Sequence, residues 1–289
     1  MNIKNKLPDG FAKELTKLVA SNRGRRGVSK LCLCEHWSRA AEILAPLNRV
    51  AVVSGFFVPS AGAPETDGPG GAIVLARAYL EQGCASEIWT DELCVKEFKK
   101  CAESVGYPCE LVKVPDVRTA LAEYGPSGII FTERLGRAKD GKYYNIRKKD
   151  ISEWTLPLDL LADEASAKGI ATVGIGDGGN EVGMGNFYSQ LKELLTDYEE
   201  CLAIVKVDAA LPVDVSNWGA YALAASLSCL WGEWRGHSGE EEKKMLDALK
   251  SCGVVDGISC QAETSVDGFC LHAQIEVVSA LRKIWRNFT

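Results

Sequence analysis

The sequence has no apolar run long enough to cross a bilayer and no concentration of basic residues. Of its 289 residues 46% are hydrophobic, yet no segment approaches the roughly 18 uninterrupted apolar residues of a membrane-spanning helix. The formal net charge of -6 argues against nucleic acid, whose binding relies on clustered Lys and Arg. We therefore expect no membrane and no nucleic-acid partner, and a small molecule as the ligand.

Paired cysteines and an apolar leader are also missing. The eleven cysteines form no CxxC pair, their number is odd, and several lie in apolar stretches, as Cys201 and Cys229 do. This usage is typical of buried free thiols in a reducing compartment. The first residues, MNIKNKLPDGFAKEL, are charged and lack the apolar centre of a signal peptide. We expect a cytoplasmic protein.

The sequence does contain short apolar runs that alternate with amphipathic stretches, which is typical of parallel strands joined by helices. The expected strands are RVAVVSGFF, SEIWT, CELVKV, GIIFT, IATVGI and CLAIVKV. The expected helices between and after them include GGAIVLARAYLEQG, DELCVKEFKKCAESVG, LDLLADEASAKG, YSQLKELLTDYEE and SNWGAYALAASLSCLWGEW. The pattern predicts one α/β domain over residues 1–289, doubly wound and Rossmann-like, with a mostly parallel sheet, helices on both faces and a helical N-terminal extension over residues 1–48.

The loop GIGDGGNEVGMGN, residues 174–186, follows a predicted strand and carries Asp177, Asn180 and Glu181 among six glycines. Its glycines satisfy GxGxxG, the fingerprint of a dinucleotide site. That fingerprint presents bare backbone N–H groups to a pyrophosphate, which the two acids would repel. We therefore expect no nucleotide cofactor.

A second loop after a strand, FFVPSAGAPETDGPGG, carries Glu65 and Asp67 just before a predicted helix. Asp67 has an alternative role as a helix cap. Ligands bind beyond the carboxyl ends of the strands in such sheets, so the two acidic loops are expected to meet there. Converging carboxylates need a cation, and oxygen ligands favour Mn²⁺ or Mg²⁺. The candidate metal ligands are Glu65, Asp67, Asp177 and Glu181.

Two further segments suit an acidic substrate. TERLGRAKDGKYYNIRKKDIS is basic in an acidic protein, and Arg134 and Arg147 are candidates to bind a carboxylate through two prongs. Ser216 and Asn217 open a predicted buried helix, where they either receive a substrate carboxylate or cap the helix.

Four motifs in order, ETDGPGGA, ERLGRAKDGKYYNIR, GIGDGGNEVGMGN and SNWGAYALAAS, resemble the D-glutamate cyclase family. The resemblance runs from about Gly55 to the VDG repeats at residues 255–257 and 266–268. It implies a lyase that removes water from D-glutamate to give 5-oxo-D-proline, reversibly, with a metal site in the acidic loops.

In that reaction Asp177 or Glu181 would be the general base, and Asn180 would orient the substrate or stabilise the intermediate. The residues expected to bind the amino acid substrate are Thr66, Gly68, Arg134, Arg147, Ser216 and Asn217. Two other functions stay open, a metal-dependent hydrolase of small phosphate esters and a sensor that binds a small molecule without turnover. Homo-oligomerisation also stays open.

Overall fold

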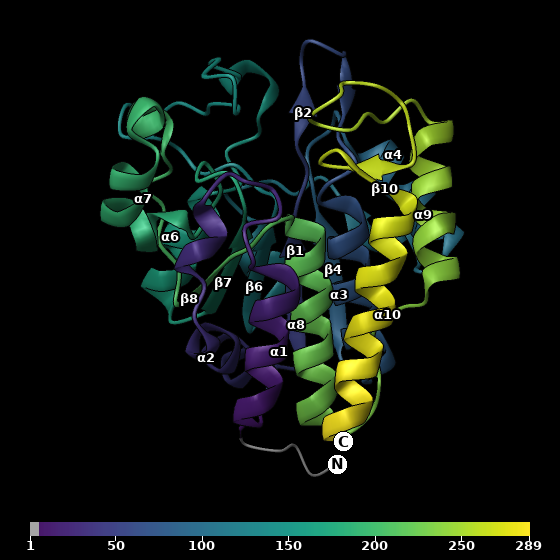
Figure 1. Ribbon diagram of the computed structural model, residues 1–289. Coiled ribbons are helices and arrows are strands. Elements are labelled where there is room, and N and C mark those ends of the chain that lie inside the picture. Colours follow the sequence, from purple (N-terminus) through teal and green to yellow (C-terminus); the bar gives the residue numbers. More distant parts are fainter. Residues whose placement is uncertain (1–5) are drawn as a thin grey trace.

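In a computed structural model, which describes residues 6–289, the chain forms a single parallel sheet with helices on both faces (Figure 1). The strands lie side by side in the order β5 (Val112–Lys113), β4 (Ala85–Trp89), β1 (Arg49–Val53), β6 (Gly128–Thr132), β7 (Ala171–Gly176) and β8 (Ala209–Pro212). Every neighbouring pair in this sheet is parallel. The predicted doubly wound α/β fold is confirmed.

Alternation along the strands divides the interior into two cores. Val50 and Val52 of β1 face one core, whereas Ala51 and Val53 face the other. The larger core is covered by α1 (Asp9–Val19), α2 (Cys34–Leu44), α3 (Pro69–Glu81), α4 (Val95–Ser104), α8 (Ser216–Trp231), α9 (Gly239–Ser251) and α10 (Leu271–Phe288). The smaller core lies under α5 (Ala120–Tyr124) and α6 (Leu160–Lys168). Because both faces are covered, the strands are buried on both sides.

The remaining elements are short and lie mostly at the ends of the sheet. They are α7 (Tyr188–Leu194), the hairpin β2 (Phe57–Val58) and β3 (Ala63–Pro64), the hairpin β9 (Ser265–Val266) and β10 (Phe269–Cys270), and the 3₁₀ turns η1 (Val28–Leu31), η2 (Cys109–Leu111), η3 (Ser152–Trp154), η4 (Met184–Phe187) and η5 (Thr196–Cys201). Both hairpins lie at the upper end of the molecule in Figure 1.

The first 48 residues are not set apart from the domain. Phe11 and Leu15 of α1 and Trp37 of α2 are fully buried in the larger core, and α1, α8 and α10 stand side by side (Figure 1). The predicted extension is therefore helical but belongs to the helix layer. Its residues 1–5 lie outside the described residues.

Helix α8 approaches α3 closely. A Cβ atom on Gly71 would lie 2.7 Å from the Cβ of Ala220, so only glycine allows this contact between the helices. The small residues of α8 thus bring the beginnings of the two helices together, which matters for the acids described below.

One predicted strand is wrong. CLAIVKV, residues 201–207, is not in the sheet, and the last strand is the following segment, Ala209–Pro212. The backbone of this segment bonds to loops, since Ala203 N donates to Gly179 O and Gly183 N donates to Val205 O, both at 3.0 Å. Its apolar side chains fill the small cores beside β7, and this burial explains the strand-like pattern.

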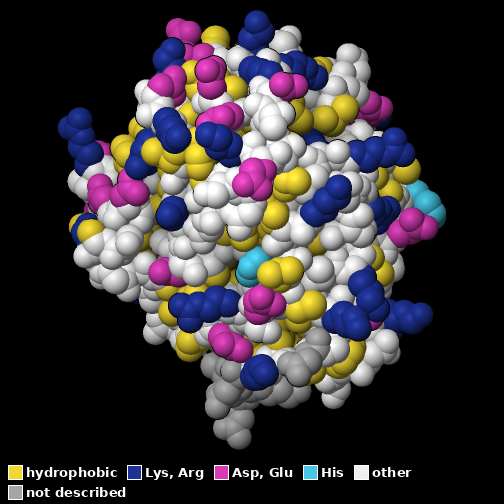
Figure 2. Space-filling model, turned by 60° about the vertical axis from the view of Figure 1, so that its left-hand side comes forward, with side chains coloured by type: hydrophobic (Ala, Val, Ile, Leu, Met, Phe, Trp, Pro, Cys, Tyr) yellow, Lys and Arg dark blue, Asp and Glu magenta, His cyan; other side chains and the backbone are white. Residues whose placement is uncertain are grey.

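The surface is of mixed charge, with Lys and Arg interspersed with Asp and Glu on the face that Figure 2 shows. No helix within residues 6–289 has the length and apolar character needed to cross a membrane.

All eleven cysteines lie in the described part of the chain and are free thiols, and Cys201 and Cys229 are buried as predicted.

Candidate metal and substrate site

The candidate site lies at the carboxyl ends of the central strands. Ser54 follows β1, Glu133 follows β6, and Asp177 follows β7. The chain runs from β1 outward to β4 and β5 on one side and returns to β6 on the other, so β1 and β6 flank the point where the strand order reverses. Ligands of doubly wound sheets bind at this point.

Three buried carboxylates meet there. One oxygen from each of Asp67, Glu133 and Asp177 lies within 4.8 Å of the others, which is a spacing that one cation can bridge. Asp67 and Asp177 come from the two acidic loops that the sequence predicted to converge. Glu133 was missed, and its backbone has a φ of 44°, a conformation uncommon for residues other than glycine.

Burial sets the protonation of these acids. Loss of solvation raises the pKa of Asp67 to about 7 and that of Asp177 to about 8. Burial and the nearby Asp177 raise the pKa of Glu133 well above its ordinary value. A group of acids that resists ionisation without a cation is a candidate for metal binding or for proton transfer.

The first turn of α8 holds two of the acids. Ser216 N donates to Asp67 Oδ2 at 2.9 Å and to Asp177 Oδ2 at 3.1 Å, and Asn217 N donates to Asp67 Oδ1 at 2.7 Å. The positive end of the helix thus stabilises carboxylates of the chain itself. The side-chain oxygen of Asn217 accepts the N–H groups of Gly68 and Gly71, whereas the buried Ser216 Oγ has no hydrogen-bond partner within the described residues.

Glu181 shapes the glycine loop. Its two carboxylate oxygens accept the N–H groups of Asp177, Gly178 and Gly179 at 3.2, 2.6 and 2.8 Å. The backbone donors that a pyrophosphate would use in a dinucleotide site are therefore bonded to the chain's own carboxylate. Glu181 lies outside the triad but lines the neighbouring cavity, so its expected roles as ligand and base stay predictions.

A cavity of about 40 Å³ lies beside the triad, roughly the space of one water molecule. Its wall contains five carboxylates and two guanidinium groups, those of Glu65, Glu133, Asp177, Glu181, Asp267, Arg26 and Arg147. The expected catalytic residue Asn180 also lines it, and its Nδ2 donates to Tyr144 O at 2.8 Å. The cavity is strongly acidic, and loop residues such as Arg147 and Ile258 form part of its wall.

Arg26 is a cation in direct contact with the triad. Its guanidinium forms ion pairs with Asp177 and, at 2.9 Å, with Asp267. Burial alone would lower the pKa of Arg26, but Asp177 and Asp267 raise it well above the ordinary value, so the group stays charged. Burial and Asp177 raise the pKa of Asp267.

The ETDG loop divides its residues between the site and the scaffold. Glu65 lines the cavity, and burial together with Asp267 raises its pKa well above the ordinary value. Thr66 Oγ1 donates to Ser265 O at 2.7 Å, which ties the loop to the second VDG repeat. Gly68 has a φ of 105° and caps α3, and it does not line the cavity. Substrate contacts of Thr66 and Gly68 stay predictions.

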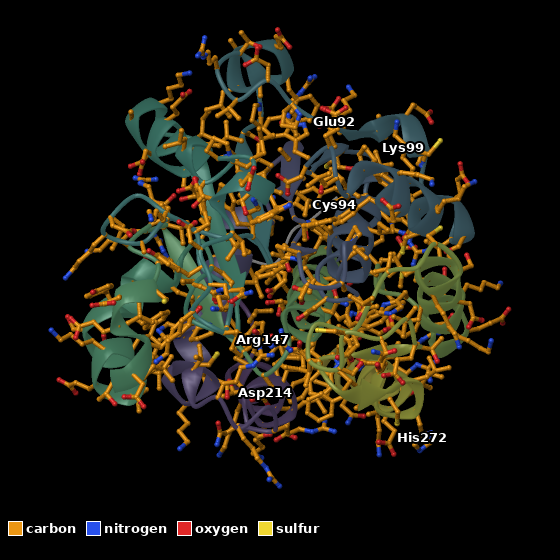
Figure 3. The ribbon with its side chains drawn as sticks, turned by 90° about the horizontal axis from the view of Figure 1, so that it is seen from above. Glu92, Cys94, Lys99, Arg147, Asp214 and His272 are labelled. Atoms are coloured by element: carbon orange, nitrogen blue, oxygen red, sulfur yellow. The ribbon has the colours of Figure 1, made fainter. Side chains whose placement is uncertain are left out.

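The two predicted substrate arginines lie in different surroundings. Arg134 is completely buried, and its guanidinium bonds to Asp91, Gly55 O and Leu156 O, away from the residues that line the cavity. Arg147 is exposed and lines the cavity, where its Nη2 donates to Ile258 O at 3.1 Å. Seen from above the sheet, Arg147 lies nearer the middle of the molecule than His272 (Figure 3). The structure brings Arg147, but not Arg134, to the acidic cavity.

Comparisons with known proteins place this geometry in context. Residues 15–282 match the family model described as D-glutamate cyclase-like, C-terminal. The chain is also similar to the mitochondrial D-glutamate cyclase of Homo sapiens, at 30% identity over 305 residues that cover 90% of this chain and 49% of that protein. The chain thus spans about half the length of the curated relative that it matches.

Proposed function

Because this chain belongs to the D-glutamate cyclase-like family, we propose that it is a lyase that converts D-glutamate into 5-oxo-D-proline and water, reversibly. The observation that carries the proposal is the buried triad of Asp67, Glu133 and Asp177 beside an acidic cavity with two guanidinium groups. An amino acid with two carboxylates and an ammonium group matches a wall that offers both signs of charge.

The donor set fits a hard divalent cation, for which we propose Mn²⁺ or Mg²⁺. Glu133 Oε2 belongs to a residue of the triad and is buried without a hydrogen-bond partner within the described residues, and an oxygen-binding cation would satisfy it. Asp67, Glu133 and Asp177 would hold this ion. When bound, it supplies a Lewis acid that makes the side-chain carboxylate of the substrate a better electrophile.

The reaction requires the chain to move protons. The amino nitrogen bonds to the side-chain carboxyl carbon, a C–O bond breaks, and two protons lost from nitrogen leave with the oxygen as water. Asp177 and Glu181 both line the cavity, and we propose that one of them accepts a proton from the ammonium group. Glu65, whose pKa is raised by burial, is suited to protonate the departing oxygen.

Hydrolysis of a small phosphate ester stays the second candidate function, because a cation held by the same triad would suit that chemistry as well. The eleven free cysteines support a reducing compartment such as the cytoplasm.

The proposal is tested by NMR of D-glutamate and of L-glutamate with metal-stripped protein, before and after Mn²⁺ is restored. We expect conversion of D-glutamate alone, dependent on the metal, lost in Asp177→Asn and retained in Asp197→Asn, a control at an exposed acid. Absence of turnover from D-glutamate and also from 5-oxo-D-proline would refute the cyclase activity.

A further inference from the structure

Residues 21–27, between α1 and η1, form a loop that brings one arginine to the site. Ser21 N donates to Asp214 Oδ2 at 2.9 Å, and Gly27 N donates to Asn22 Oδ1 at 2.9 Å. The Arg23 guanidinium lies 4.6 Å from the centre of the Trp218 ring on α8. The loop is thus held to Asp214 and to Trp218, and one hydrogen bond within it links its two ends.

Adjacent arginines of this loop have different surroundings. Arg25 is exposed, whereas the side chain of Arg26 is only 19% exposed and reaches Asp177 and Asp267 at the cavity. Asp267 has a φ of 53°, so an uncommon backbone conformation places its carboxylate against the guanidinium. Both sides of this contact are therefore built by the fold.

An amino-dicarboxylate cannot enter this cavity without a cation for each anionic end. The side-chain carboxylate is the end that reacts, and the α-carboxylate passes unchanged from D-glutamate into 5-oxo-D-proline. Arg147 already donates to Ile258 O at the exposed rim. Arg26 is less exposed than Arg147 and contacts Asp177, a member of the triad. A substrate whose side-chain carboxylate reacts at the triad would therefore have its α-carboxylate close to Arg26.

We propose that Arg26 is the residue that binds the α-carboxylate of the substrate, an inference that rests on the proposed function. A planar guanidinium offers two parallel N–H donors to a carboxylate, and Arg26 already uses both of its Nη atoms on carboxylates. The substrate's α-carboxylate replaces Asp177 or Asp267 as one of these partners.

This replacement couples Arg26 to the acids. A cation at the triad neutralises part of the charge of Asp177 and so weakens the ion pair between Asp177 and Arg26. The guanidinium of Arg26 is then available to bind the α-carboxylate of the substrate. By linkage, a ligand that carries the α-carboxylate then strengthens the binding of the cation to the same degree. The small size of the cavity agrees with a site in which Arg26 gives way to the ligand.

The test uses two probes that differ only at the group in question, 5-oxo-D-proline and its neutral amide, 5-oxo-D-prolinamide. Calorimetry measures the binding of each to the whole chain, with and without Mn²⁺, for the wild type and for Arg26→Gln, Arg26→Lys and Arg25→Gln. The Arg25 variant is the matched control, because it removes a neighbouring charge that is exposed.

We expect Arg26→Gln to weaken the binding of 5-oxo-D-proline by about 10- to 100-fold, which is the usual effect of losing a hydrogen bond to a charged group. Binding of the amide should be unchanged, Arg26→Lys should recover part of the difference, and Arg25→Gln should match the wild type. The strengthening of Mn²⁺ binding by the acid should disappear in Arg26→Gln.

Two results would overturn the inference alone. One is a wild-type preference for the acid that persists in Arg26→Gln, and the other is an equal loss of the acid and the amide, which would indicate a structural role. A wild-type protein that binds neither probe and converts no glutamate would instead refute the proposed function, and the inference with it.

Discussion

Asp67 and Asn217 each bond to the backbone beside the other. Asp67 Oδ1 accepts the N–H group of Asn217 at 2.7 Å, and Asn217 Oδ1 accepts the N–H groups of Gly68 and Gly71 at 3.0 and 2.7 Å. The exchange joins the first turn of α3 to the first turn of α8. The position of one triad carboxylate is therefore fixed by the packing of two buried helices.

Replacing Asn217 should cost stability as well as function. Asn217→Ala leaves the buried N–H group of Gly71 without its acceptor and the carbonyl of Thr66 without the Asn217 Nδ2 donor, whereas Gly68 N keeps a second acceptor in Asp67 Oδ1. Each unsatisfied buried group costs about 1–3 kcal/mol. We expect the free energy of unfolding in urea to fall by more than about 2 kcal/mol. Asn287→Ala, at an exposed position near the end of α10, should leave it unchanged, and an equal effect of both variants would contradict the role of Asn217.

Glu133 should be essential for binding of the cation. Glu133→Gln removes one of three anionic ligands and should weaken Mn²⁺ binding by at least about tenfold. Electron paramagnetic resonance of free Mn²⁺ measures the dissociation constant directly. The control is Glu123→Gln, which changes an exposed acid on α5. An unchanged dissociation constant in Glu133→Gln would exclude Glu133 as a ligand.

Stability of the metal-free protein should fall as the pH rises. The pKa values of Asp67 and Asp177 are raised to about 7 and about 8 in the folded state, so the folded chain holds protons that the unfolded chain has released. This contribution is complete below the unfolded pKa of about 4 and is lost as the pH rises through about 8. Urea unfolding with EDTA should show lower stability at pH 8.5 than at pH 5.5.

The same titration gives a control for that prediction. Asp177→Asn removes one of the titrating groups and should flatten the dependence on pH between these two values. Added Mn²⁺ should stabilise the wild type more at pH 8.5 than at pH 5.5, since the cation competes with protons for the same oxygens. A metal-free protein that gains stability at the higher pH would show that the acids are ionised in the fold.

Arg134 should act on stability and not on substrate affinity. Arg134→Lys cannot bond to Asp91, Gly55 O and Leu156 O at once, and each buried group left unsatisfied costs about 1–3 kcal/mol. We expect a lower melting temperature and an unchanged KM for D-glutamate. Arg118→Lys, at an exposed position, should change neither. A raised KM at unchanged stability would restore Arg134 as a substrate residue.

The sequence was sufficient for the fold and for part of the site. Alternating runs predict the parallel sheet because buried strands need apolar residues on both faces. The strand prediction for CLAIVKV was wrong because an irregular segment that packs into small cores needs apolar residues just as a buried strand does. Asp67 and Asp177 were predictable since each lies in a loop that follows a strand. Glu133 directly follows β6, and the same rule applied to GIIFTE would have found it.

Arg26 and Asp267 left no comparable signal. Arg26 lies in a loop before the first strand and Asp267 in a hairpin turn far beyond the last, so neither is placed by the pattern of strands. They meet because α1 and α10 pack beside α8, which brings the loop after α1 and the hairpin before α10 to the same edge of the sheet. Such a meeting depends on tertiary packing, which a local pattern does not encode.

The buried acids also have a consequence for how the protein would respond to selection. Carboxylates that resist ionisation at neutral pH oppose folding there, so a neutral replacement at Glu65, which unlike Asp177 and Asp267 forms no ion pair with Arg26, is expected to make a metal-free chain more heat-resistant. A search for heat-resistant variants that ignored activity would therefore collect substitutions in the site itself. In this fold, a buried carboxylate can favour the binding of a cation and, in the same position, lower the heat resistance of the metal-free chain.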